Sequence, residues 1–113
     1  MDISEVVDWL EDYQQKHPDA TTKFGWTEGG SYRGYYDEFS VEPSDSEVDI
    51  ETMIGVLCDA IGQTFYGYKG GEYTMNESSE VYYAPYGNTG PIVSKALLRA
   101  IFEDPDFNYT DYE

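Results

Sequence analysis

Apolar residues that recur every three or four positions between residues 50 and 65 restrict the fold more than any other pattern in the chain. On an α-helix this spacing places them along one face. The residues are Ile50, Met53, Ile54, Leu57, Ile61 and Phe65. The carboxylates that precede them suit the positive end of a helix dipole. The sequence therefore predicts an amphipathic helix over about residues 47–63.

Two further helices are predicted near the ends of the chain. Apolar residues at positions 3, 6, 7 and 10 share one helical face, and Asp2 stands three residues before Glu5 in a capping-box arrangement. This helix should span residues 3–16 and stop at the following His-Pro pair. Pro91 suits the first turn of a last helix, which should end near Glu103.

Between the predicted helices, the apolar pattern changes to a period of two. Residues 21–28 and 31–41 alternate around a Glu-Gly-Gly-Ser turn, and tyrosine-rich residues 65–75 and 80–86 form a second predicted hairpin. The order helix, hairpin, helix, hairpin, helix predicts an α+β domain. We expect a mainly antiparallel sheet of about four strands, covered by about three helices. One domain should span residues 1–103, followed by an acidic, aromatic tail over residues 104–113.

The charge balance excludes several classes of function. The 113 residues contain 23 Asp and Glu but 6 Lys and Arg, which gives a formal net charge of -17. Because phosphate neutralisation needs clustered cations, we expect no direct binding to nucleic acid and none to anionic membranes. The apolar runs are too short for a membrane span, and the acidic start is unlike a signal peptide. We therefore expect an intracellular protein.

Catalytic and metal-binding residues are scarce. One histidine, His17, lies at a predicted helix end, and one cysteine, Cys58, borders the apolar stripe of the helix over residues 47–63. A lone cysteine makes neither an internal disulfide nor a multi-thiolate metal site, and we expect a buried, unreactive thiol. No nucleophile stands beside a base, so the sequence predicts a non-enzymatic protein without metal or cofactor.

The carboxylates themselves form the first candidate site. They recur along one side of the first predicted helix and again before the second, where like charges repel at a cost of some tenths of a kcal/mol per pair. A basic partner would relieve that repulsion. The candidate partner-binding residues are Asp2, Glu5, Asp8, Asp12, Asp37, Glu38, Glu42, Asp45, Glu47, Asp49 and Glu51. Simple solubility, or adaptation to high salt, would also explain an acidic surface.

Two basic residues embedded in tyrosine and glycine form the second candidate site. Glycine lets a ligand approach backbone N–H groups, tyrosine offers stacking faces, and Arg or Lys binds phosphate or carboxylate. The candidate ligand-binding residues are Tyr32, Arg33, Tyr35, Tyr36, Tyr68, Lys69 and Tyr73. The alternative is that these tyrosines only pack the sheet.

The same segments carry a resemblance. The motif Ser-Tyr-Arg-Gly-x-Tyr at residues 31–36, the motif Gly-Tyr-Lys-Gly-Gly-Glu-Tyr-Thr-Met at residues 67–75 and the later Val81 and Thr89-Gly90 resemble a family of small uncharacterised tailed-phage proteins over about residues 30–92. This resemblance implies the cytoplasm of a bacterial host and a non-structural early role, and it brings no catalytic residues. In charge and size alone, the chain is similar to acidic DNA-mimic anti-defence proteins.

The leading prediction is a phage-type inhibitor whose DNA-mimicking surface blocks a basic, nucleic-acid-binding host protein, as an anti-CRISPR or anti-restriction protein would. The alternative is a binding protein, or sponge, for a nucleotide signal, which would use the tyrosine-rich segments. An enzyme is the third class. The sequence leaves both a monomer and a homodimer open.

Overall fold

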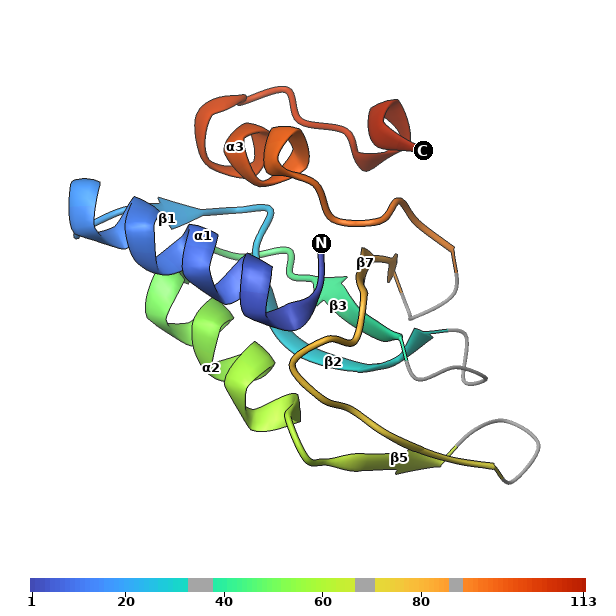
Figure 1. Cartoon of the computed structure of the whole chain (residues 1–113). Helices are drawn as coiled ribbons and strands as arrows, with labels where there is room; N and C mark the ends of the chain where they lie inside the picture. The colour runs from blue at the N-terminus through green and yellow to red at the C-terminus, as the bar shows by residue number, and fades with distance from the viewer. Residues whose placement is uncertain (33–37, 67–70, 86–88) are drawn as a thin grey trace.

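A computed structural model describes residues 1–32, 38–66, 71–85 and 89–113. It confirms the α+β class (Figure 1). The helices are α1 (Ile3–Lys16), α2 (Ile50–Ala60) and α3 (Lys95–Glu103), with a 3-10 turn, η3, at Tyr109–Tyr112. The strands are β1 (Thr21–Thr22), β2 (Trp26–Ser31), β3 (Phe39–Pro43), β4 (Val48–Asp49), β5 (Thr64–Tyr66), β6 (Glu72–Thr74) and β7 (Val81–Tyr83).

Helix α1 has the bounds that its sequence predicts. The Asp2 carboxylate accepts a hydrogen bond from the backbone N–H of Glu5 at 2.9 Å, and the Glu5 carboxylate accepts one from the N–H of Asp2 at 3.0 Å. This reciprocal pair is the predicted capping box. Ile3, Val6 and Leu10 bury the apolar face.

The other two helices begin later than predicted because side chains cap them later in the sequence, and α2 also ends earlier than predicted, at Ala60. The Asp49 carboxylate accepts the N–H of Thr52 at 2.7 Å and starts α2 at residue 50. The Ser94 hydroxyl accepts the N–H of Leu97 and starts α3 at residue 95, so Pro91 lies before the helix in an extended segment. Helix α3 ends at residue 103, as predicted.

The strands divide among three small sheets. The central sheet has the order β2-β3-β7, in which β2 and β3 are antiparallel while β3 and β7 are parallel. The pairs β1-β4 and β5-β6 are separate antiparallel ribbons. The predicted turn at residues 28–31 is instead part of β2, and the strand at residues 81–83 pairs with β3 rather than closing a second hairpin.

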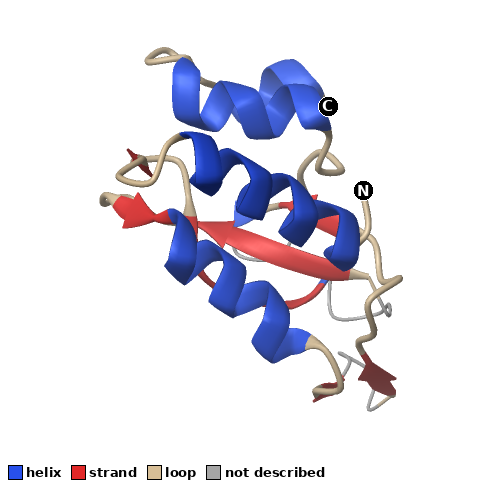
Figure 2. Cartoon of the chain, turned by 60° about the vertical axis from the view of Figure 1, so that its left-hand side comes forward, coloured by secondary structure: helices blue, strands red, loops and turns tan. Residues whose placement is uncertain are grey.

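The helices cover one side of the central sheet. Helices α1 and α2 lie side by side, and α3 lies along the opposite flank of α1 (Figures 1 and 2). Phe102 of α3 stacks on Tyr13 of α1 with ring centroids 4.6 Å apart, and Tyr13 stacks on Trp9 at 5.1 Å. No helix within the described ranges is long and apolar enough to span a membrane.

The C-terminal residues 104–113 pack against the domain. The ring of Phe107 lies 5.1 Å from that of Phe24 and 5.6 Å from that of Tyr83, and Tyr112 packs on Phe107. These aromatic residues hold the tail, while its carboxylates stay exposed.

We predict that Trp26→Phe will destabilise the domain by about 2–3 kcal/mol, measured by urea denaturation with far-UV circular dichroism. Trp26 is fully buried, and its indole N–H donates to the carbonyl oxygen of Met53 at 3.0 Å. The substitution removes this hydrogen bond and part of a core ring. Trp9→Phe is the control, because it keeps a stacked ring at a half-buried position. Equal losses in the two variants would contradict this prediction.

Candidate partner-binding surface

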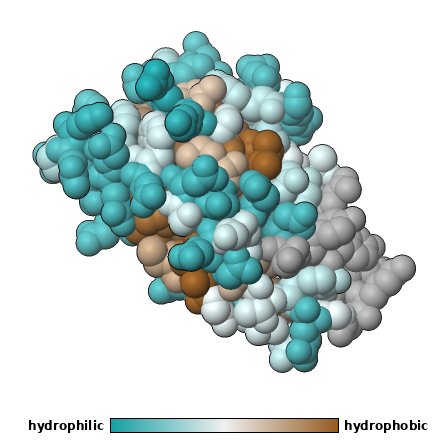
Figure 3. Space-filling view, viewed as in Figure 1, coloured by the Kyte–Doolittle hydropathy of each residue, from teal (hydrophilic) through white to brown (hydrophobic). Residues whose placement is uncertain are grey.

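One group of predicted carboxylates is gathered at the end of the molecule where α1 finishes and α2 begins. Asp49 and Glu51 line a hollow of about 290 Å³ together with Asp19, which the sequence prediction did not include. Glu47 lies beside them, because its carboxylate accepts a 2.6 Å hydrogen bond from the Thr21 hydroxyl. We call Asp19, Glu47, Asp49 and Glu51 the acidic end. Figure 3 shows hydrophilic residues gathered at this end of the visible face.

The local fold explains this grouping. Pairing of β1 with β4 sets Thr21 opposite Asp49, so the chain after α1 lies against the start of α2. Hydrogen bonds from the Thr52 side chain and backbone lower the pKa of Asp49, which keeps this carboxylate ionised while it caps the helix. Asp49 therefore serves both the fold and the surface charge.

A row of exposed carboxylates follows α1, with Asp12 on the side of α3 and Glu11 on the side of α2. Glu5, Asp8 and Asp12 follow the predicted spacing, and Glu11 joins them. Asp2, at the head of the row, is half-buried and used in the helix cap, where the N–H of Glu5 lowers its pKa. Asp2 therefore stabilises the helix, while the later carboxylates of the row are exposed to solvent.

The pKa of the Cys58 thiol depends on carboxylates of both α1 and α2. It is exposed rather than buried as predicted, since it follows the buried Leu57 and projects from a different face of α2. Partial burial raises the pKa of its thiol, and the carboxylates of Glu11 and Asp59 raise it further. Negative charge from two helices therefore acts on one point of this surface.

A second carboxylate group surrounds a separate hollow beside β2 and β3. Glu28 stands opposite Glu42 in the strand register, and both line a hollow of about 390 Å³ with Asp45. Burial raises the pKa of Glu42, and a hydrogen bond and repulsion from Glu28 add to the effect. Glu42 therefore holds its proton more tightly than an ordinary glutamate does.

The remaining predicted carboxylates lie elsewhere. Glu38 is half-buried, and its charge contributes, after burial, to a raised pKa of Tyr82. Asp37 lies outside the described residues. Other exposed carboxylates occupy β6, the turn before β7 and the tail.

Few carboxylates are neutralised by basic side chains. Among the described residues, the Lys and Arg ion pairs are Lys16 with Asp12 at 3.1 Å and Arg99 with Glu103 at 3.9 Å. The amino terminus adds one pair with Glu80 at 3.3 Å. The acidic end and the Glu28–Glu42 pair have no described Lys or Arg within ion-pair distance.

Two of the predicted ligand-binding residues, Tyr32 and Tyr73, lie within the described ranges. Tyr32 stacks on Tyr82 with ring centroids 3.9 Å apart, and Tyr73 is half-buried against the core. Arg33, Tyr35, Tyr36, Tyr68 and Lys69 lie outside the described residues, so a pocket around them stays a prediction. Across the described ranges, no three or more His, Cys, Asp or Glu side chains are grouped to hold a metal ion.

Four carboxylates at these surfaces were missed by the sequence analysis: Glu11, Asp19, Glu28 and Asp59. Asp19 and Glu28 join their groups through strand pairing, which single-strand patterns do not reveal. Glu11 follows helical spacing relative to Asp8 and was accessible from the sequence.

No protein-family model, curated protein or solved structure matches the chain.

We predict that Glu11→Gln and Asp59→Asn will each speed alkylation of Cys58 by iodoacetamide at a fixed neutral pH. Removing either carboxylate lowers the pKa of the thiol and increases the reactive thiolate fraction. The control is Glu77→Gln, which removes an exposed carboxylate from the turn before β7. Equal alkylation rates in the parent protein and all three variants would contradict the claim that carboxylates of both helices raise the pKa of Cys58.

We also predict that Glu28→Gln will become more stable relative to the parent protein as the pH rises from about 4.5, the ordinary pKa of a glutamate, toward neutrality. The raised pKa of Glu42 means that the parent loses stability as that carboxyl ionises. A glutamine can donate an amide N–H to the ionised Glu42. Urea denaturation at several pH values measures the difference. Asp45→Asn removes one charge from the same hollow without changing the pair, and it should lack this pH dependence.

Proposed function

We propose that this protein is a non-enzymatic inhibitor whose acidic end and adjacent α1 carboxylates occupy the nucleic-acid-binding groove of a basic protein. The observation that carries the proposal is the grouping of Asp19, Glu47 and Glu51 with Asp49 on adjoining elements, with no described Lys or Arg in ion-pair contact. Such a surface presents closely spaced negative charges to the Arg and Lys side chains of a cationic protein, as a phosphate backbone does.

Electrostatic competition is the mechanism. A chain with a formal charge of -17 attracts a basic groove at long range and speeds association, and its carboxylates then occupy the Arg and Lys positions that would contact phosphates. The helix caps and β1-β4 pairing hold several of these groups in fixed places, which reduces the entropy lost on binding.

The proposed setting is the cytoplasm of a bacterium infected by a phage. The tyrosine- and glycine-rich motifs that resemble tailed-phage proteins support this setting. The proposed targets are host defence proteins that grip nucleic acid through Arg and Lys, including CRISPR and restriction proteins.

We predict that Asp19→Lys/Glu51→Lys will weaken capture of the target by at least about tenfold, which corresponds to roughly 1.4 kcal/mol. The protein, immobilised on a resin, is mixed with lysate of a bacterial host at low and high NaCl, and the captured proteins are identified by mass spectrometry. Binding of each purified target is then measured in competition with duplex DNA.

Glu72→Lys/Glu77→Lys is the matched control, because it changes the net charge equally at exposed positions away from the acidic end. It should bind nearly as well as the parent protein. An equal loss of target binding in both variants would mean that binding depends on net charge alone and not on the acidic end, which would contradict the proposal. Capture that is insensitive to salt would contradict the electrostatic mechanism.

A further inference from the structure

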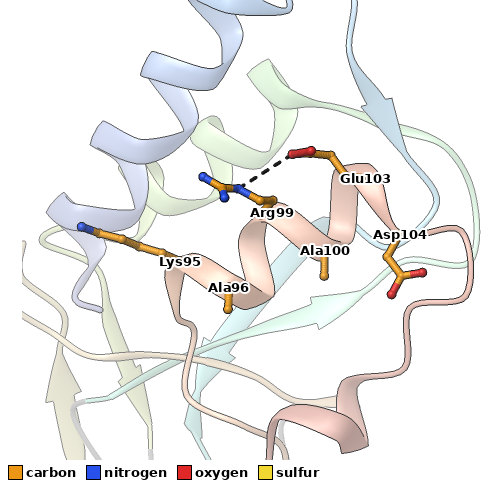
Figure 4. Close-up of a pocket in the computed structure, with 6 residues that line it drawn as sticks. All are labelled: Lys95, Ala96, Arg99, Ala100, Glu103 and Asp104. Atoms are coloured by element: carbon orange, nitrogen blue, oxygen red, sulfur yellow. Dashed lines mark ion pairs between the residues drawn. The ribbon is translucent and has the colours of Figure 1, made fainter.

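Helix α3 carries its charges in the order that an isolated helix disfavours. Lys95 is its first residue and Arg99 its middle one, while Glu103 is its last residue and Asp104 its C-cap (Figure 4). A helix dipole favours acidic residues at the N-terminus and basic residues at the C-terminus. The first turn of α3 has no acidic residue and its last turn no basic one. The helix dipole therefore disfavours the charge order of α3.

Lys95, Arg99 and Glu103 form one stripe along α3, beside a stripe of two alanines (Figure 4). With Ala96 and Ala100, they line a hollow of about 490 Å³ along α3 (Figure 4). Ala100 is 8% exposed, and Ala96 is open to solvent. Side chains this small allow another helix to approach the backbone closely.

The local charge is balanced where the rest of the chain is strongly acidic. The hollow along α3 adjoins a second one of about 280 Å³ between α1 and α3, with Arg99 and Glu103 shared by both. Their charged lining residues are Lys16, Lys95 and Arg99 against Asp12, Glu103 and Asp104. Two copies that meet through this surface bring balanced charges into contact, so the local repulsion is weaker here than at the acidic surfaces.

We propose that α3 is a self-association surface, on which the α3 of a second copy docks antiparallel across a two-fold axis. That arrangement brings Lys95 and Arg99 of each copy toward Glu103 and Asp104 of the other, and a two-fold axis repeats every such pair. It also sets the N-terminus of each helix beside the C-terminus of its neighbour, which relieves the unfavourable charge order on both.

The contact is small, so the dimer is weak. A helix of nine residues is about 14 Å long, and a stable interface usually buries about 800 Å² on each partner. The half-buried rings of Trp9 and Tyr13 in the adjoining hollow extend the contact along α1. This proposal does not depend on the identity of any other partner.

The test uses sedimentation equilibrium of the full chain over a wide concentration range. Lys95→Glu/Arg99→Glu and Glu103→Lys/Asp104→Lys should each lower the self-association constant by at least about tenfold, because like charges then face each other. An equimolar mixture of the two variants should associate at least as tightly as the parent protein. Circular dichroism checks that each variant keeps its fold.

Two further variants keep the result decisive. Glu72→Lys/Glu77→Lys changes the net charge as much as Glu103→Lys/Asp104→Lys but lies outside both hollows, and it should retain the association. Ala96→Trp keeps every charge but fills the hollow, and it should abolish dimer formation even if a charge-reversed variant unfolds. A parent protein that stays monomeric at all concentrations, a mixture of the reversed variants that does not associate, or an Ala96→Trp protein that dimerises normally would overturn the proposal.

Discussion

Mutual repulsion among carboxylates is the constraint on which the rest of the structure depends. Because the chain has 23 acidic and 6 basic residues, internal ion pairs can neutralise only a minority of the acids. The fold places these charges at the surface and uses some of them as helix caps, while buried residues such as Trp26, Phe39 and Leu97 form the core. Stability comes from apolar burial, and the charge remains available for recognition.

The helices were predicted from sequence far better than the strand pairing. Apolar spacing, the Asp2–Glu5 capping box and the His17-Pro18 pair are local signals, and together they define α1 at both ends. Helix α3 begins later than predicted because Ser94, rather than the segment at Pro91, provides the N-cap. The parallel pairing of β7 with β3 joins strands far apart in the sequence, and no local pattern specifies it.

The carboxylates of the candidate surface were also predicted where local patterns place them and missed where strand pairing brings them together. Helical spacing indicated the carboxylates of α1, and a local run indicated those before α2. The meeting of Asp19 with Asp49 and of Glu28 with Glu42 depends on strand register. The two proposed surfaces differ in their use of charge: the acidic end is arranged for a cationic partner, while α3 is balanced and suits a second copy.

The most direct test of DNA mimicry is whether a captured target binds this protein and duplex DNA at the same time. Fluorescence anisotropy of labelled duplex DNA, with the target held near its dissociation constant and this protein added, measures the competition. DNA mimicry predicts complete displacement, with a binding constant that falls as salt rises, as expected of a protein that contacts phosphates. A stable ternary complex of target, DNA and this protein would contradict it.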